Sequence, residues 1–73
     1  MSQEWETTVK GLLKGELRRR GVTYHELAER LISIGVAESA ENIANKISRG
    51  KFSAVFFVQC LHVIGCNTLR VND

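Results

Sequence analysis

The sequence has no proline, only two cysteines and no long hydrophobic run in its 73 residues. The longest apolar run, residues 54–58, is far too short to span a bilayer. The first residues lack the basic region and apolar stretch of a signal peptide, so we expect a cytoplasmic location. The chain has room for a single domain with one modest core. Its 44% hydrophobic and 25% charged residues are ordinary for a globular helical domain.

The sequence also lacks the motifs of known catalytic sites. There is no Gly-rich phosphate loop, His-Glu-x-x-His motif or Gly-x-Ser-x-Gly motif. Cys60, His62 and Cys66 match no established zinc spacing and offer only three soft ligands, whereas free cysteine in an apolar helix behaves as a small hydrophobe. His25 and His62 are accompanied by no recognisable nucleophile or substrate pocket. We therefore expect no enzyme activity, no metal and no cofactor.

The cations are concentrated in two segments. Residues 10–20 carry Lys10, Lys14, Arg18, Arg19 and Arg20 against Glu16, and residues 46–51 carry Lys46, Arg49 and Lys51 with no anion. Acidic residues prevail in the stretch between them. If the fold brings the two segments to one face, that face would attract a polyanion. The alternative is that they are ordinary solvated helix surfaces.

Apolar spacing predicts a first helix from about Glu4 to Arg20, ended by Gly21. Its apolar stripe consists of Trp5, Val9, Leu12, Leu13 and Leu17. Gly11 and Gly15 flank this stripe, and glycines so placed would allow another backbone to approach closely.

A capping box formed by Thr23 and Glu26 predicts the start of a second helix, with Val22 and Leu27 as a hydrophobic staple. This helix is expected to end near residues 34–35. The side chains expected to be buried are Tyr24, Leu27, Ala28, Leu31 and Ile32.

A third helix is expected to open at Glu38 or Ser39 and to end at Gly50, with Ala40, Ile43, Ala44 and Ile47 on one side. A fourth, residues 54–64, has Ser53 as its cap and Phe52 and Phe57 as a staple. It is apolar almost all round, which predicts a central, enclosed helix. The pattern indicates an all-α, compact bundle of four to five helices forming a single domain over residues 1–73. Its core spans about residues 4–66, and the tail 67–73 is either flexible or, through residues 68–71, a short strand that could pair in a dimer.

Residues 20–31, Arg-Gly-Val-Thr-Tyr-His-Glu-Leu-Ala-Glu-Arg-Leu, resemble the start of a Cro/C1-repressor-type (lambda-repressor-like) helix-turn-helix. Residues 45–51, Asn-Lys-Ile-Ser-Arg-Gly-Lys, resemble the end of that family's recognition helix, and residues 52–66 its last helix. The resemblance covers about residues 9–66. The chain is also similar to a small, functionally uncharacterised bacterial domain family with the elements Arg-Gly-Val-Thr-Tyr, Asn-Lys-Ile-Ser-Arg-Gly and Gln-Cys-Leu.

Two features depart from the repressor pattern. Gly35 stands seven residues after Ala28, so the second helix or the turn must be longer than in that family. Glu38 and Glu41 lie in the first turns of the third helix, where they would repel phosphates, although glutamate can accept a hydrogen bond from cytosine.

The resemblance implies a bacterial transcription regulator that binds double-stranded DNA as a dimer, with the helix at about residues 38–49 in the major groove. Asn42 and Asn45 would then pair with adenine, and Lys46 or Arg49 with guanine. The residues expected to contact phosphate are Lys51, Arg18, Arg19 and Arg20. The alternative for the asparagines is exposed helix surface, and for Lys46 and Arg49 it is stabilisation of the helix C-terminus.

A second hypothesis is a protein-interaction module that keeps the helix-turn-helix scaffold and does not bind DNA. It predicts an exposed apolar patch around Trp5, Tyr24 or Phe56.

Overall fold

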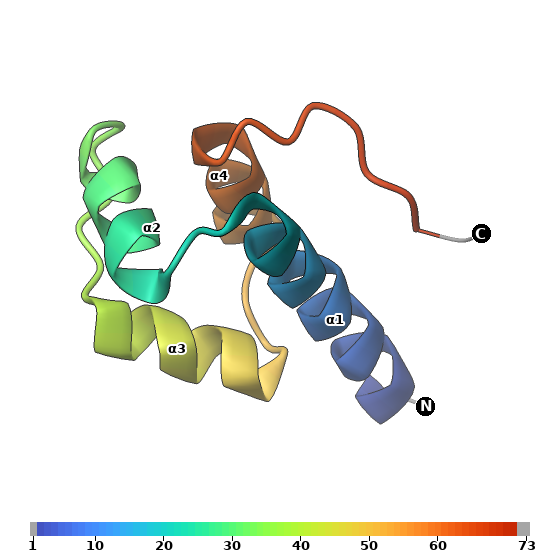
Figure 1. Cartoon of the computed structure of the whole chain (residues 1–73). Helices are drawn as coiled ribbons and strands as arrows, with labels where there is room; N and C mark the ends of the chain where they lie inside the picture. The colour runs from blue at the N-terminus through green and yellow to red at the C-terminus, as the bar shows by residue number, and fades with distance from the viewer. Residues whose placement is uncertain (1, 72–73) are drawn as a thin grey trace.

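The computed structural model describes residues 2–71 and contains four α-helices, with no β-strand in that range (Figure 1). The helices are α1 (Ser2–Arg20), α2 (Tyr24–Ile32), α3 (Ala40–Arg49) and α4 (Ala54–Val63). The all-α class and the compact helical bundle are confirmed.

The helices pack across one another rather than in parallel (Figure 1). The helix α3 packs against both α2 and α1, and α4 packs against α2. The N-terminal end of α1 extends beyond the other helices, and the molecule measures 34 × 23 × 20 Å along its principal axes.

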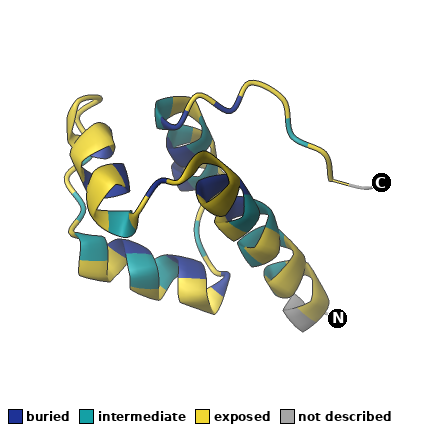
Figure 2. Cartoon of the chain, in the orientation of Figure 1, coloured by how far each residue is buried: buried dark blue, intermediate teal, exposed yellow. Residues whose placement is uncertain are grey.

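Each helix contributes two large side chains to a shared core. The core side chains from the helices are Leu13 and Leu17, Leu27 and Leu31, Ile43 and Ile47, and Phe56 and Cys60. Buried positions accordingly face inward on all four helices (Figure 2). A core drawn equally from four short helices explains how so small a chain becomes compact, because no single helix could bury its apolar side alone.

The caps that the sequence predicts are formed. The Thr23 hydroxyl accepts a hydrogen bond from the Glu26 backbone N–H at 3.1 Å, and the Thr23 N–H donates to Glu26 Oε1 at 2.9 Å. The Ser39 and Ser53 hydroxyls each accept from a backbone N–H three residues later, at 3.0 Å. Of the two predicted starts of the third helix, Ser39 is therefore its cap.

The glycine that permits a close backbone approach is Gly50, between α3 and α4. It adopts φ 67°, and a Cβ at this position would lie 2.6 Å from the Glu6 carbonyl oxygen. The prediction that Gly11 and Gly15 serve this purpose is wrong. Among the described residues, nothing lies within 4 Å of a Cβ at Gly11, and only the Arg19 guanidinium approaches one at Gly15.

Four apolar positions are more exposed than their spacing predicts. Trp5 is 67% exposed because the first turns of α1 extend past the bundle, and Ile32 at the end of α2 is 62% exposed. The prediction that α4 is enclosed is also wrong, since Val55 and Val58 are 65% and 60% exposed. Within the described chain, no other helix covers this outer side of α4.

The tail forms no strand within its described part, and a strand at residues 68–71 that pairs in a dimer stays a prediction. Leu69 is partly buried against the core, and the Cys66 thiol donates to the Thr68 carbonyl at 3.2 Å. Packing against the core therefore continues beyond residue 66. Residues 72–73, also part of the predicted tail, lie outside the described residues.

Candidate nucleic-acid interface

The outer side of α3 presents two amides and a guanidinium. Asn42, Asn45 and Arg49 are all exposed, and their spacing of three and four residues places them in one stripe. Ile43 and Ile47 are fully buried on the opposite side and hold the helix against α1 and α2. The buried side of α3 therefore holds the exposed stripe in a defined position on the domain.

A line of cations on α1 begins at Lys10, beside the C-terminal end of α3. Lys10, Lys14 and Arg18 are four residues apart and share one side of α1. Lys10 Nζ donates to the Ser48 carbonyl oxygen at 3.1 Å, and a cation is favourable at this end of the helix dipole. Lys10 and Arg49 also line a common small cleft. The two helices thus bring cations from both of the segments found in the sequence to one surface.

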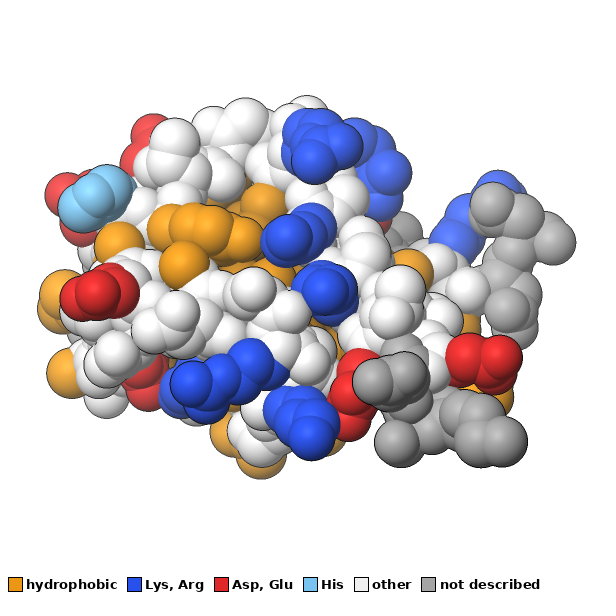
Figure 3. Space-filling model, turned by 90° about the horizontal axis from the view of Figure 1, so that it is seen from below, with side chains coloured by type: hydrophobic (Ala, Val, Ile, Leu, Met, Phe, Trp, Pro, Cys, Tyr) orange, Lys and Arg blue, Asp and Glu red, His pale blue; other side chains and the backbone are white. Residues whose placement is uncertain are grey.

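We define the basic face by its cations Lys10, Lys14, Arg18 and Arg49 and by the two asparagines Asn42 and Asn45. Seen from below, the lysine and arginine side chains border an apolar hollow (Figure 3). A hollow lined by Leu17, Val22 and Tyr24 lies between α1 and the start of α2, with Lys14 and Arg18 also lining it. Cations edge the hollow on the right of this view, and acidic side chains lie to its left (Figure 3).

Most of the cations on the basic face are not neutralised by the protein itself. Among the described residues, Lys14, Arg18 and Arg49 make no ion pair, and Lys10 is bonded to a neutral carbonyl. Their charge is therefore available to a ligand.

Two other predicted site residues are held by internal contacts. Lys46 Nζ donates to Glu38 Oε2 at 2.7 Å and lies 4.7 Å from the centre of the Phe56 ring. Lys51 Nζ lies 3.8 Å from a carboxylate oxygen of Glu6. The pair with Lys46 also offsets the charge of Glu38, one of the two glutamates expected to repel phosphate. The other, Glu41, is exposed at the N-terminal end of α3.

Arg19 and Arg20 belong to a different side of α1. Both are bonded to Glu16, Arg20 through Nε at 3.3 Å, and Arg20 also donates to the Gly65 carbonyl at 3.4 Å. The Arg19 hydrogen bond, opposed by desolvation and aided by Arg20, lowers the pKa of Glu16 from its ordinary value. The two arginines line a groove between α1 and the tail rather than the basic face. The structure therefore does not bring them together with Asn42, Asn45 and Arg49.

Lys10 and Lys14 are the residues of the basic face that the sequence analysis did not select. The signal was present in their spacing, since steps of four from Arg18 lead to Lys14 and then to Lys10. The three consecutive arginines Arg18, Arg19 and Arg20 do not share a face, because consecutive residues on a helix point in different directions.

The remaining chemistry of the described chain is sparse. Cys60 and Cys66 are free and buried, and burial raises the pKa of the Cys60 thiol to about 12, opposed in part by the nearby Lys46 charge. The residues described contain no cluster of His, Cys, Asp and Glu suited to a metal ion. None of the helices in that part of the chain is long and apolar enough to cross a membrane.

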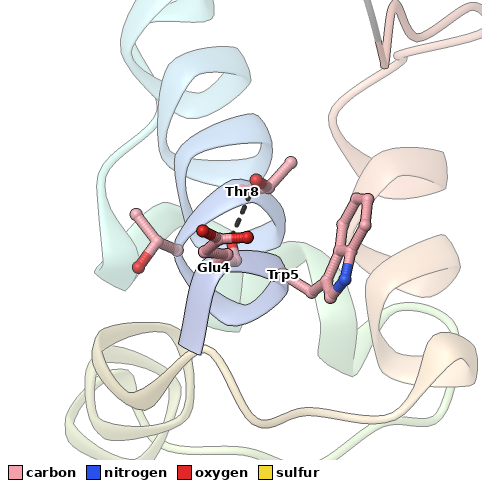
Figure 4. A pocket seen from close by; sticks show the side chains of 4 residues that line it. Glu4, Trp5 and Thr8 are labelled. Atoms are coloured by element: carbon pink, nitrogen blue, oxygen red, sulfur yellow. Dashed lines mark hydrogen bonds between the residues drawn. The ribbon is translucent and has the colours of Figure 1, made fainter. Parts of the chain in front are cut away.

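A second exposed feature is Trp5, near the beginning of α1. Its indole projects beside Glu4 and Thr8 in a shallow pocket, where the Thr8 hydroxyl donates to the Glu4 carbonyl at 2.9 Å (Figure 4). Of the other residues named for an apolar patch, Tyr24 is partly buried and Phe56 is buried. Trp5 is thus the exposed member of that set.

Fold and surface together define a small all-α domain with an unneutralised basic face. Residues 5–69 match the model of a family described as "Domain of unknown function (DUF6471)", and the chain belongs to that family. No curated protein sequence and no solved structure matches the chain.

Proposed function

We propose that the chain is a double-stranded-DNA-binding domain of a bacterial, cytoplasmic transcription regulator. The observation that carries the proposal is the basic face, where amide and guanidinium side chains of α3 lie beside a line of cations on α1. The resemblance to Cro/C1-type helix-turn-helix domains supports it. In this interaction α3 lies in the major groove, as recognition helices do.

The side chains of α3 match the edges of the bases. Asn42 and Asn45 are amides that can each bond an adenine edge through its acceptor and donor, and Arg49 can bond a guanine through two acceptors. Since these three side chains are exposed in one stripe, a single orientation of α3 can bring all three to the major groove of DNA.

The cations of α1 suit the phosphate backbone. Each phosphate neutralised by a lysine or arginine releases a counterion, so such contacts favour binding to any DNA sequence. Lys14 and Arg18 stand beside Thr23 at the start of α2, whose first backbone N–H groups and helix dipole also favour an anion. Lys51, Arg19 and Arg20 are weaker candidates because each is already paired with a glutamate.

The test is binding of random-sequence duplex DNA across a salt series. For the wild-type chain we expect micromolar binding that weakens steeply with salt. Lys14→Ala/Arg18→Ala, which removes two of the cations assigned to phosphate, should bind more weakly, and its log–log salt slope should be shallower by about two.

The matched control is Arg19→Ala/Lys51→Ala, which removes the same charge from two cations that are already paired. Its salt slope should change by less than half as much. Equal losses in the two variants would show that only net charge matters and would refute the basic face as the interface. Absence of binding at low salt would refute DNA binding by this domain.

A protein-interaction role is the alternative, favoured by the exposed Trp5. It predicts that Trp5→Ala abolishes capture of a protein partner and leaves the salt slope of DNA binding unchanged. Loss of DNA binding in Trp5→Ala would instead link this residue to the first function.

A further inference from the structure

Lys46 lies at an edge of the exposed stripe of α3. It follows Asn42 by four residues and precedes Arg49 by three, so the three side chains leave neighbouring positions on the helix surface. Asn42 and Arg49 are exposed, whereas Lys46 is partly buried and its ammonium group is bonded within the protein. Lys46 therefore stands where a cation can reach DNA, but it is held by another part of the chain.

Two contacts hold the Lys46 ammonium group. It donates to Glu38 Oε2 at 2.7 Å, a length typical of a charge-assisted hydrogen bond, and lies 4.7 Å from the centre of the Phe56 ring. The side chains of Lys46 and Glu38 are 40% and 20% exposed, so salt screens this pair less than a fully solvated one. The pair of Lys51 with Glu6 is longer, at 3.8 Å, and Lys51 is more exposed. Lys46 is thus the more firmly held of the two lysines.

We propose that Glu38 withholds Lys46 from the phosphates of DNA and so lowers the affinity of the domain for DNA of any sequence; this role rests on the proposed function. A cation favours binding by releasing a counterion from phosphate. The pair of Lys46 with Glu38 has no net charge. Moving Lys46 to a phosphate would only exchange one anion for another, and it would leave an unpaired carboxylate beside the DNA backbone, where like charges repel.

The two glutamates near the start of α3 differ in what they contact. Glu38 is the only charged residue of the connection 33–39 between α2 and α3, and it is bonded to Lys46. Glu41 lies in the first turn of α3, is exposed and makes no ion pair among the described residues. Removing either carboxylate removes one negative charge from the same end of α3, but only the loss of Glu38 also releases a cation.

This difference supplies the test, which uses random-sequence duplex DNA across a salt series. Glu38→Gln should bind about fivefold more tightly than the wild type at about 0.1 M salt, with a log–log salt slope steeper by about one. Glu41→Gln is the matched control, and its slope should change by less than half as much. Circular dichroism establishes that each variant is folded.

Two further variants assign the effect to Lys46. Lys46→Gln should leave the wild-type slope unchanged, because this cation is already neutralised. Glu38→Gln/Lys46→Gln should return the slope of Glu38→Gln to the wild-type value, whereas an effect of the altered connection on the shape of the domain would persist in the double variant. Equal slopes for Glu38→Gln and Glu41→Gln would overturn the proposal. So would a slope for Lys46→Gln that is shallower by about one, since Lys46 would then contact phosphate in the wild-type complex.

Elution from immobilised heparin measures attraction to a polyanion without DNA. Glu38→Gln should elute at a higher salt concentration than Glu41→Gln. If this order holds and the wild type binds no duplex DNA, the proposed function fails and the withholding of Lys46 from polyanions stands. If the wild type binds DNA and the two glutamine variants elute together, the role of Glu38 fails and the proposed function stands.

Discussion

The helices α3 and α4 are built alike and present opposite surfaces. Each has ten residues, begins at a serine cap and is followed within two residues by a glycine in the left-handed conformation. Each also directs two large side chains into the same core, Ile43 and Ile47 from α3 and Phe56 and Cys60 from α4. In length, in their serine caps and in the number of large core side chains, the two helices are alike.

Their outer sides differ completely. α3 exposes Asn42, Asn45 and Arg49, whereas α4 exposes Val55 and Val58. The inner residues therefore determine the fold, and the outer residues determine which partner each helix can take. A polyanion suits the first surface and a second apolar surface suits the other.

The largest change in the free energy of unfolding is expected for a substitution at Gly50, in the connection between α3 and α4. Gly50→Ala would force a non-glycine residue into φ 67° and bring its Cβ to 2.6 Å from the Glu6 carbonyl oxygen. We expect the free energy of unfolding to fall by about 2–4 kcal/mol, combining the conformational cost with overpacking. Urea unfolding followed by circular dichroism measures it.

The control for Gly50 is Gly11→Ala, the same substitution inside α1 where a Cβ meets nothing within 4 Å among the described residues. It should stabilise the chain by about 0.5–1 kcal/mol, because alanine is a better helix former than glycine. If both variants were destabilised equally, the close approach at Gly50 would not be the cause.

The equivalence of the two helix starts can be tested at their caps. Ser39→Ala and Ser53→Ala each remove a hydroxyl that accepts from a backbone N–H at 3.0 Å, and each should lower the free energy of unfolding by about 1 kcal/mol. Ser48→Ala, an exposed serine inside α3, should change it by less than about 0.5 kcal/mol. A large difference between the two caps would mean that α3 and α4 do not begin in equivalent ways.

The local contacts that sequence predicts correctly join residues within about one and a half turns of helix. The Thr23 and Glu26 capping box, the Ser53 cap and the contact of the Phe52 and Phe57 rings at 5.9 Å all join residues at most five positions apart. At such short range the chain itself holds the partners together, so spacing and residue type are sufficient.

The features that sequence misses depend on distant partners. Gly11 and Gly15 have the better helical spacing, yet the close backbone approach occurs at Gly50, because α1 crosses the turn after α3 at Glu6. The exposure of Val58 and Ile32 depends likewise on which helix happens to cover them. The apolar character of a side chain shows that its burial is favourable. It does not show whether the fold places another helix over that side chain.

The sequence shows which cations could form the candidate interface, but not which of them remain unpaired in the folded chain. The two cation segments meet at Lys10 and Arg49, an arrangement that the charge distribution alone left open. Sequence could not show that Lys46 is bonded to Glu38, eight residues earlier and in the connection before α3. Which cations remain free for a ligand is decided by such tertiary pairs.

The smallest effect on stability is expected at Glu16 of α1. One side of this helix faces α3, and the other side approaches α4. Lys14 and Arg18 are unpaired among the described residues, whereas Arg19 and Arg20 share Glu16, and Arg20 also reaches the Gly65 carbonyl after α4.

Because the pKa of Glu16 is lowered in the folded chain, its contribution to stability is present above the unfolded pKa and is lost as the pH falls through the folded value. Denaturant unfolding between neutral and acidic pH should therefore show the wild type more stable than Glu16→Gln at neutral pH, with the difference vanishing in acid. Glu29→Gln, at an exposed glutamate for which no ion pair was found among the described residues, should show no such convergence. A difference for Glu16→Gln that persisted unchanged in acid would mean that shape, and not charge, holds the arginines on that side of α1.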